Sequence, residues 1–382
     1  MAKNNLARRW RVLQIVASSR GGGAELLRCL VKGFDPAQFE SVVIMPDDGG
    51  HVGAADFSAL GVPLERFAID ARFSVAEFLR LRRFVRQGNF DLIHLHSARA
   101  ALWGRLAAFG AHRSRIVFGV HGLSIVHYAG VKRAVLVGIE RLLRPMTDAT
   151  LCDSNAERAD VLAWKIASPS QAHAVWNGID LDRLSHPPHD RIAARRALDL
   201  AEQTPTFVTV CRLNKPRDFE TLIAGMAQIA ASHPNAQLLI VGDGPLRAQV
   251  ENLIEQFHLA NNVRLLGLVR DVGEVLAAAD IALLITAGWE GLPLAALEAM
   301  AMGLPLIISD VGGNREAVLD GETGFVIPQR DVTAFAHAAC ALLADPVRAR
   351  AIGAAGAERA RKYFSLQTMA ARTAEIYRSL LQ

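Results

Sequence analysis

The stretch GWEGLPLAALEAMAMGLPLIISD, residues 288–310, joins a helical pattern to a strand pattern. A helix is expected to begin near Pro293, because proline is favoured in the first turn of a helix. PLIISD, residues 305–310, is a short apolar run typical of a buried strand. Two carboxylates, Glu290 and Glu298, stand in this otherwise apolar stretch, and carboxylates are costly to bury without a partner. The stretch therefore predicts an α/β fold and a polar site within it.

The same alternation of short strands and longer helices extends along the whole chain. Strands are expected in the first half at residues 11–17, 40–46, 91–96, 116–122 and 148–154. They are expected in the second half at residues 206–212, 236–244, 262–269, 281–287, 305–310 and 324–328. Continuous apolar strands separated by helices indicate parallel sheets covered on both faces. We therefore predict an α/β protein with two doubly wound domains.

The boundary between the domains is expected just after WNGID, residues 176–180, where the periodicity stops and prolines appear. We assign residues 1–185 to an N-terminal domain and residues 186–360 to a C-terminal domain. Residues 361–382 are expected to form one terminal helix, with Ser365 as a cap at its start.

Composition and charge exclude several classes of protein. The chain has 382 residues, of which 51% are hydrophobic, so each half can bury a core. The N-terminal part is basic, but no arginine-rich tail is interleaved with aromatic residues, so we expect no nucleic-acid partner. The four cysteines form no CxxC pair, which argues against a zinc site or a disulfide framework and suits a reducing cytoplasm. No apolar run is long enough to span a membrane, so any membrane contact is expected to be peripheral.

Two loops carry residues suited to phosphate. In SSRGGGAE, residues 18–25, three glycines open a helix after the first strand, which suits either an anion site or an ordinary tight turn. In CRLNKPRDF, residues 211–219, Arg212, Lys215 and Arg217 follow the first strand of the second domain. Doubly wound sheets bind ligands at the carboxyl ends of their strands, so a diphosphate is the expected ligand, and a solvated basic loop is the alternative.

Two pairs of residues could suggest a metal. His94 and His96 lie on one face of an expected strand, but no third ligand is spaced nearby, so we interpret them as residues lining a cleft. Asp180 and Asp182 form a DxD pattern, which in some sugar transferases holds a divalent cation. The pattern follows a turn signal at the domain boundary, so we interpret it as turn and cap chemistry and expect no metal.

Taken together, these stretches resemble the retaining, nucleotide-sugar-dependent glycosyltransferases of the GT-B fold, specifically glycosyltransferase family 4. The resemblance runs nearly end to end. The shorter matching stretches are GGGAE, DLIHLHS, GVHG, DSNAERAD, WNGID, CRLNKPRDFETLI, VGDGPLR and ADIALLIT, and the most specific is EGLPLAALEAMAMGLPLIISDVGGNREAVLDGETGFVIP. It implies two Rossmann-like domains that face each other across a cleft, the first for the acceptor and the second for the nucleotide sugar. The C-terminal helix is implied to return to the N-terminal domain.

The resemblance also assigns roles to the acidic and basic residues. Glu290 matches a glutamate that contacts the donor sugar near the reacting carbon, and Glu298 matches one that holds the ribose. Arg212 matches the arginine that neutralises the donor diphosphate. The family usually has a lysine five residues later, where this chain has Arg217, so Arg217 and Lys215 both remain candidates for the second cation.

The remaining expected donor contacts come from both domains. His121 of GVHG matches a histidine that approaches the donor sugar from the N-terminal domain. Gly22 and Gly23 match a glycine loop that faces the donor phosphate and the acceptor. The other residues expected to bind the donor are Gly291 and Leu292, beside the start of a helix, and Leu268 and Arg270, where the family places the base.

The implied activity is that of a retaining hexosyltransferase. A sugar would pass from a nucleoside-diphosphate sugar, with a UDP-sugar favoured, to a hydroxyl of a sugar or lipid-linked acceptor. We expect this in bacterial envelope polysaccharide or glycolipid synthesis, in the cytoplasm and at the inner face of the membrane. A sugar-nucleotide epimerase and a non-catalytic sugar-nucleotide-binding subunit are the alternatives. Basic segments at residues 78–87 and 127–145 suit an anionic membrane, although ordinary amphipathic helices have the same pattern.

Overall fold

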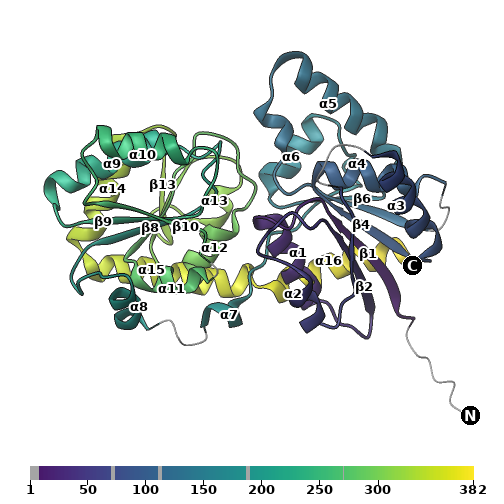
Figure 1. Cartoon of the computed structure of the whole chain (residues 1–382), viewed down its shortest axis with the longest axis horizontal. Coiled ribbons are helices and arrows are strands. Elements are labelled where there is room, and N and C mark those ends of the chain that lie inside the picture. Colours follow the sequence, from purple (N-terminus) through teal and green to yellow (C-terminus); the bar gives the residue numbers. More distant parts are fainter. Residues whose placement is uncertain (1–7, 70–73, 111–113, 186–189, 270) are drawn as a thin grey trace, which may run out of the picture. The chain divides into compact units, whose positions relative to one another are not determined.

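The computed structural model describes residues 8–69, 74–110, 114–185, 190–269 and 271–382. The chain forms two compact units (Figure 1). Unit 1 comprises Met1–Gly178 together with Leu366–Gln382, and unit 2 comprises Ile179–Ser365. The boundary lies within WNGID, a few residues before the position given by the sequence analysis, and Arg270 lies outside the described residues.

Unit 1 is built on one parallel sheet of seven strands in the order β3-β2-β1-β4-β5-β6-β7. The strands are β1 (Trp10–Val16), β2 (Phe39–Met45), β3 (Leu64–Arg66), β4 (Leu92–His96), β5 (Arg115–Gly119), β6 (Ala149–Cys152) and β7 (Ala172–Ala174). The order reverses between β1 and β4, and ligands of doubly wound sheets bind at such a switch point.

Helices cover the sheet of unit 1 and bury its apolar strands. They are α1 (Gly22–Gly33), α2 (Ala54–Ala59), α3 (Val75–Gln87), α4 (Ser97–Ala108), α5 (Gly130–Leu143), α6 (Asn155–Ala163) and α16 (Leu366–Leu381). The side chains of Ser74 and Ser154 accept backbone N–H bonds at the starts of α3 and α6, as helix-capping serines do. The last helix, α16, packs beside α1. The C-terminal helix is therefore part of the N-terminal unit, as predicted.

Unit 2 has a parallel sheet of six strands in the order β10-β9-β8-β11-β12-β13. The strands are β8 (Thr206–Val210), β9 (Gln237–Val241), β10 (Val263–Gly267), β11 (Ile281–Leu284), β12 (Leu306–Ser309) and β13 (Gly324–Ile327). The switch point lies between β8 and β11, so the loops after these two strands meet at one place.

The helices of unit 2 complete its core around residues such as Phe207 and Phe335, which are fully buried. They are α7 (Leu181–Ser185), α8 (Arg191–Ala197), α9 (Phe219–Ser232), α10 (Arg247–Gln256), α11 (Val272–Ala278), α12 (Leu294–Ala301), α13 (Asn314–Ala317), α14 (Val332–Ala344) and α15 (Pro346–Tyr363). Gly225 of α9 allows close packing, because a Cβ there would lie 2.1 Å from the ring of Phe335 in α14.

The structure confirms every strand expected from the sequence and adds β3 and β7. These two edge strands have three residues each, too few to show a pattern of alternation. One expectation was wrong in its boundary: residues 361–363 end α15, and the last helix begins only at Leu366. Within the part of the chain that the structure describes, no helix is both long and apolar enough to cross a bilayer.

Candidate active site

The switch point of unit 2 carries an ion pair between two of the predicted site residues. Arg217 follows β8 and Glu290 follows β11, and Arg217 Nη1 donates to Glu290 Oε1 at 2.6 Å. Both side chains are largely buried, with 15% and 13% of their surface exposed. Arg212 and Lys215 lie on the same loop as Arg217 and are exposed. One cation therefore holds the carboxylate, while two others face solvent nearby.

The loop after β9 fixes the backbone of the arginine loop. A Cβ on Gly242 would lie 1.9 Å from the carbonyl oxygen of Cys211, so only glycine permits this approach. Leu213 N donates to the carbonyl oxygen of Asp243 at 3.1 Å. Arg212 lies between these two contacts, so its backbone is held on both sides.

The loop after β12 fixes the backbone of Glu290 in the same way. Gly312 has a φ of 44°, and a Cβ there would lie 1.9 Å from the carbonyl oxygen of Glu290. Gly313 N donates to that oxygen at 3.0 Å. The carboxylate of Glu290 is thus positioned both by Arg217 and by the main chain of a neighbouring strand loop.

The helix that follows Glu290 begins beside Pro293, as predicted. Pro293 is the N-cap residue of α12 rather than its first helical residue, and Glu298 lies in the second turn, half-buried. Gly291 and Leu292 are buried between the two glutamates. On the loop after β10, Leu268 is 83% exposed, whereas Arg270 is not among the described residues.

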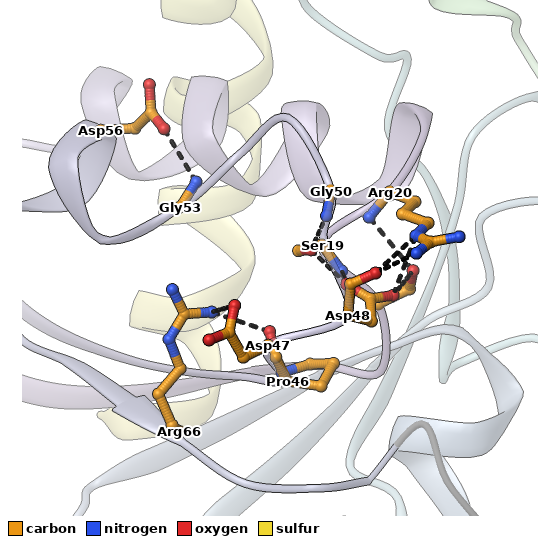
Figure 2. Close-up of polar contacts among 10 residues, drawn as sticks. Ser19, Arg20, Pro46, Asp47, Asp48, Gly50, Gly53, Asp56 and Arg66 are labelled. Atoms are coloured by element: carbon orange, nitrogen blue, oxygen red, sulfur yellow. Dashed lines mark hydrogen bonds and ion pairs between the residues drawn. The ribbon is translucent and has the colours of Figure 1, made fainter.

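In unit 1, the glycine loop after β1 is held by an aspartate that the sequence analysis missed (Figure 2). The carboxylate of Asp48 accepts from Ser18 Oγ at 2.6 Å and from Ser19 N at 2.9 Å, and Arg20 Nε donates to its backbone carbonyl at 2.7 Å. Burial raises the pKa of Asp48, but the hydrogen bonds from the two serines together lower it by a larger amount. The pKa of Asp48 therefore lies below its usual value. Asp48 therefore stays ionised and orders the residues that precede Gly22.

The feature of the sequence that could have identified Asp48 as a site residue was its position after a strand. PDDGG, residues 46–50, follows β2 at the carboxyl end of the sheet, where loops of this fold gather. Gly50 lies against Ser19, because a Cβ on it would come within 2.1 Å of the Ser19 carbonyl oxygen. By contrast, Gly22 begins α1, and a Cβ on Gly23 would meet nothing within 4 Å among the described residues. Gly23 therefore leaves open space at the helix start.

His121 follows β5 and lies between a carboxylate and another imidazole. Its backbone has a φ of 51°, in the left-handed region. His121 Nδ1 is 2.9 Å from Asp153 Oδ1, and His121 Nε2 is 2.8 Å from His96 Nδ1. Gly122 N donates to the carboxylate of Glu157 in α6 at 2.9 Å, which fixes the turn. The ring of His121 is therefore held on both of its nitrogens.

The interpretation of His94 and His96 as residues lining a cleft was wrong. Both side chains point into the interior, with 1% of each residue exposed, because β4 is a central strand covered on both faces. Burial lowers the pKa of each imidazole well below its usual value, so both are neutral. No third ligand is spaced near them in the sequence, but the adjacent strand β5 brings His121 to them in the fold.

The geometry of this histidine cluster is that of hydrogen bonding. One ring nitrogen from each of His94, His96 and His121 lies within 4.8 Å of the others, a spacing that a metal could use. However, the ring planes of His96 and His121 are inclined to each other by only 6°. The ring centroids are 5.1 Å apart, while His96 Nδ1 and His121 Nε2 are 2.8 Å apart. The two nitrogens therefore point straight at each other, as in an N–H···N bond. Metal ligands would instead converge on a third point.

Comparison with known proteins identifies the family. Residues 20–183 match the family model described as Glycosyltransferase Family 4, and residues 190–359 match that of Glycosyl transferases group 1. The chain is 30% identical over 318 residues to a phosphatidyl-myo-inositol mannosyltransferase of Mycobacterium leprae, covering 80% of this chain and 78% of the relative. This chain belongs to glycosyltransferase family 4.

Other relatives and structures agree with this assignment. The glycosyltransferase is 27% identical over 320 residues to the UDP-Gal:alpha-D-GlcNAc-diphosphoundecaprenol alpha-1,3-galactosyltransferase of Escherichia coli, covering 81% of each chain. Its fold matches that of Anabaena HepE in complex with UDP and glucose, with a TM-score of 0.85 at 21% identity over 97% of this chain and 100% of the other. It also matches sucrose-phosphate synthase of Thermosynechococcus elongatus, with a TM-score of 0.81 at 24% identity over 97% of this chain and 99% of the other. The GT-B fold is thereby confirmed.

Within each unit of the glycosyltransferase, the structure brings some predicted residues together and leaves others apart. Arg217 and Glu290, to which the resemblance gave separate roles, form one ion pair in unit 2. In unit 1, His121 contacts His96 and lies near His94, two histidines that had been interpreted only as residues lining a cleft. The roles of these residues in catalysis are proposals, which follow.

Proposed function

We propose that this glycosyltransferase moves a hexosyl group from a nucleoside-diphosphate sugar, with a UDP-sugar favoured, to a hydroxyl of a sugar or lipid-linked acceptor. The anomeric configuration is retained, and the product belongs to bacterial envelope polysaccharide or glycolipid. The observation that carries the proposal is the Arg217–Glu290 pair at the switch point of unit 2, with Arg212 and Lys215 exposed on the same loop. The M. leprae and E. coli relatives are named for activities on a phosphatidylinositol and on a diphosphoundecaprenol-linked sugar, which supports a lipid-linked acceptor.

In this proposal the exposed cations bind the diphosphate and the ion pair binds the sugar. Negative charge grows on the diphosphate as the glycosidic bond breaks, and fixed cations stabilise that charge at little cost of reorganisation. Arg212 and Lys215 supply this positive charge, and the start of α12, just after Gly291 and Leu292, adds the N-terminal partial charge of a helix. Arg217 holds the carboxylate of Glu290 in place, so that Glu290 accepts hydrogen bonds from donor hydroxyls.

The remaining residues complete donor and acceptor binding in the proposal. Glu298 holds the ribose, and the stretch from Leu268 to Arg270 contacts the base. Gly22 and Gly23, ordered by Asp48, leave room for the donor phosphate and the acceptor. No protein nucleophile takes part: the acceptor hydroxyl attacks on the face that the diphosphate leaves, and the diphosphate accepts its proton. These cations supply the charge that a metal would otherwise bring, so we propose transfer without a metal.

The test is an assay of product configuration. A panel of nucleotide sugars is first screened by thermal shift, because a bound donor stabilises the fold. With the best donor and lipid-linked or free sugar acceptors, NMR of the product is expected to show the donor's anomeric configuration, and excess EDTA is expected not to change the rate. An inverted linkage, or strict dependence on a divalent metal, would contradict the mechanism. Donor consumed without acceptor would indicate an epimerase, and binding without turnover a non-catalytic subunit.

A peripheral contact with anionic membrane is part of the proposal, and α5 supports it. Its inner face is fixed by Glu140, which accepts from buried Arg105 at 2.7 Å. Its outer face presents an apolar stripe along the helix, with Val131 80% and Leu142 78% exposed. The stripe also includes Val135 and Ile139, and Lys132, Arg133 and Arg141 lie beside it. An apolar stripe flanked by cations suits the surface of an anionic bilayer, which supports the proposed position of the enzyme at the inner face of the membrane.

Flotation with liposomes measures this contact. The wild-type chain is expected to float with vesicles containing about a third anionic lipid and much less with neutral vesicles, because each basic residue near the surface contributes about 1 kcal/mol. The variant Val131→Ser/Leu142→Ser is expected to remain in the dense fraction. Val347→Ser removes a valine of unit 2 that is 70% exposed and is the matched control. Equal flotation of all three proteins, or none by the wild type, would contradict the role of α5.

A further inference from the structure

A buried chain of hydrogen bonds joins α16 to His121 within unit 1. Tyr377 Oη of α16 lies 2.7 Å from Nδ1 of His94 and 3.4 Å from Nε2 of Gln14, in β1. Gln14 Oε1 lies 2.8 Å from His96 Nε2, and His96 Nδ1 lies 2.8 Å from His121 Nε2. Every member except His121 is at most 1% exposed. Because each contact has one donor and one acceptor, the direction of one bond fixes the direction of the next.

The direction is set at the tyrosine. Burial raises the pKa of Tyr377, so its hydroxyl keeps the one proton that it can donate. Burial, with the charge of His121 adding to it, lowers the pKa of His94 well below its usual value, so His94 is neutral. Gln14 turns its Nε2, which can only donate, toward Tyr377 Oη, so the hydroxyl accepts there and its own proton is left for His94. Tyr377 therefore donates to His94, and in its contact with Gln14 the amide N–H of Gln14 is the donor.

The remaining bonds follow from that orientation of the amide. With its nitrogen toward Tyr377, Gln14 turns its oxygen toward His96, so His96 Nε2 must carry a proton. Burial keeps the pKa of His96 low, and its neutral ring has only this proton, so His96 Nδ1 accepts. In the contact between His96 Nδ1 and His121 Nε2, the proton therefore belongs to His121 Nε2. The other nitrogen of His121, Nδ1, faces the carboxylate of Asp153 at 2.9 Å and is protonated as well.

We propose that Gln14, His96 and Tyr377 are positioning residues that hold His121 as an imidazolium cation, with both of its N–H groups bonded inside unit 1. The consequence for catalysis rests on the proposed function, in which His121 approaches the donor. Because both protons are engaged, His121 offers the donor a fixed positive charge and does not transfer a proton. Such a charge favours the departure of the diphosphate.

The groups that surround His121 are consistent with a cation there. Asp153 pairs with it directly, and Glu157 of α6 lies behind Asp153, accepting from Asp153 N at 2.6 Å. Burial and the charge of Asp153 raise the pKa of Glu157 well above its usual value, so Glu157 adds little competing negative charge. The carboxylate oxygen of Asp153 can only accept, so the proton in its contact with His121 lies on Nδ1 of the ring.

Nitrogen NMR on protein with isotope-labelled histidine tests the proposal without any substrate. In the wild type at neutral pH, both ring nitrogens of His121 are expected as N–H, while His94 and His96 show one N–H each. His121→Asn identifies the His121 signals by their loss. Tyr377→Phe and Gln14→Met break the chain, and each is expected to lower the midpoint of the His121 titration by about one pH unit, which is tenfold in proton affinity. His173 of β7, outside the chain, is the internal control.

A neutral His121 in the wild type, or an unchanged midpoint in both folded variants, would overturn the proposal. Should Tyr377→Phe fail to fold in a thermal melt, Gln14→Glu provides the second test. Its carboxylate can only accept from His96, so it keeps the bonds of His96 and His121 in the same direction and is expected to raise the midpoint, although it takes the proton of Tyr377 away from His94. In active enzyme, the alkaline limb of the plot of kcat against pH is expected to shift to lower pH in Tyr377→Phe, by the same amount as the midpoint of the His121 titration. A cationic His121 in a protein that transfers no sugar would contradict the proposed function and leave this inference standing.

Discussion

Arg212→Ala is expected to lower kcat by about 100- to 1,000-fold, the usual loss when one preorganised group that stabilises developing charge is removed. Arg212 follows β8 at the switch point, and its backbone is held by contacts of Cys211 and Leu213. Its side chain is exposed, so the free energy of unfolding is expected to change by no more than about 0.5 kcal/mol. Steady-state kinetics with the best donor, together with a thermal melt, measures both quantities.

The control for Arg212 is another arginine of the same unit, whose side chain is 39% exposed. Arg247 pairs with Glu251 one turn later on α10, at 2.9 Å, and Arg247→Ala is expected to leave the kinetics unchanged. If Arg212→Ala turned over as fast as Arg247→Ala, the diphosphate would have to be neutralised elsewhere. Lys215→Ala then tells whether the second exposed cation of the loop does so.

A double-mutant cycle on Arg217 and Glu290 is expected to show that the two side chains act as one unit. Glu290→Gln keeps the shape of the side chain and removes its charge, which leaves the guanidinium of Arg217 largely buried without its carboxylate. We expect a loss in kcat/KM of about 100-fold or more for each single variant, because each removes either the hydrogen-bond acceptor for the sugar or the group that aims it. The double variant Arg217→Ala/Glu290→Gln is expected to be no slower than the slower single variant.

The cycle separates the two roles considered for Arg217. Losses that multiply in the double variant would show that Arg217 binds the diphosphate independently of Glu290, as the match to the family lysine implied. Arg217→Lys adds a finer comparison. A lysine can supply a charge but not the planar fork of donors, so a large loss would indicate that the geometry of the pair matters.

Much of the fold could be predicted because apolar strands and helices alternate regularly along the chain. β11 and β12 are continuous apolar runs in a buried parallel sheet, and such runs are visible in the sequence alone. β3, with the sequence LER, has three residues and lies at the edge of its sheet. Its position depends on pairing with β2, which local sequence does not encode.

The candidate site was predicted less completely, because its contacts join distant parts of the chain. The positions of Arg217 and Glu290 could be proposed, but their pairing depends on β8 and β11 being neighbours in the sheet. The buried chain of hydrogen bonds includes Tyr377, which lies 283 positions after His94 in the sequence. Asp48 was missed because a short PDDGG turn indicates a loop and not the partner of that loop.

The return of α16 to unit 1 has a consequence for the order of folding during synthesis. Strands β1 to β7 leave the ribosome early, but the helix that packs on α1 and carries Tyr377 follows all of unit 2. At about 5–20 residues per second, translating unit 2 takes on the order of 10 to 40 s. Throughout that interval unit 1 lacks α16 and its buried residue Tyr377. The apolar surface that α16 covers in the complete chain is therefore exposed to solvent. A message cut short after residue 365 would release unit 2 intact and unit 1 unfinished.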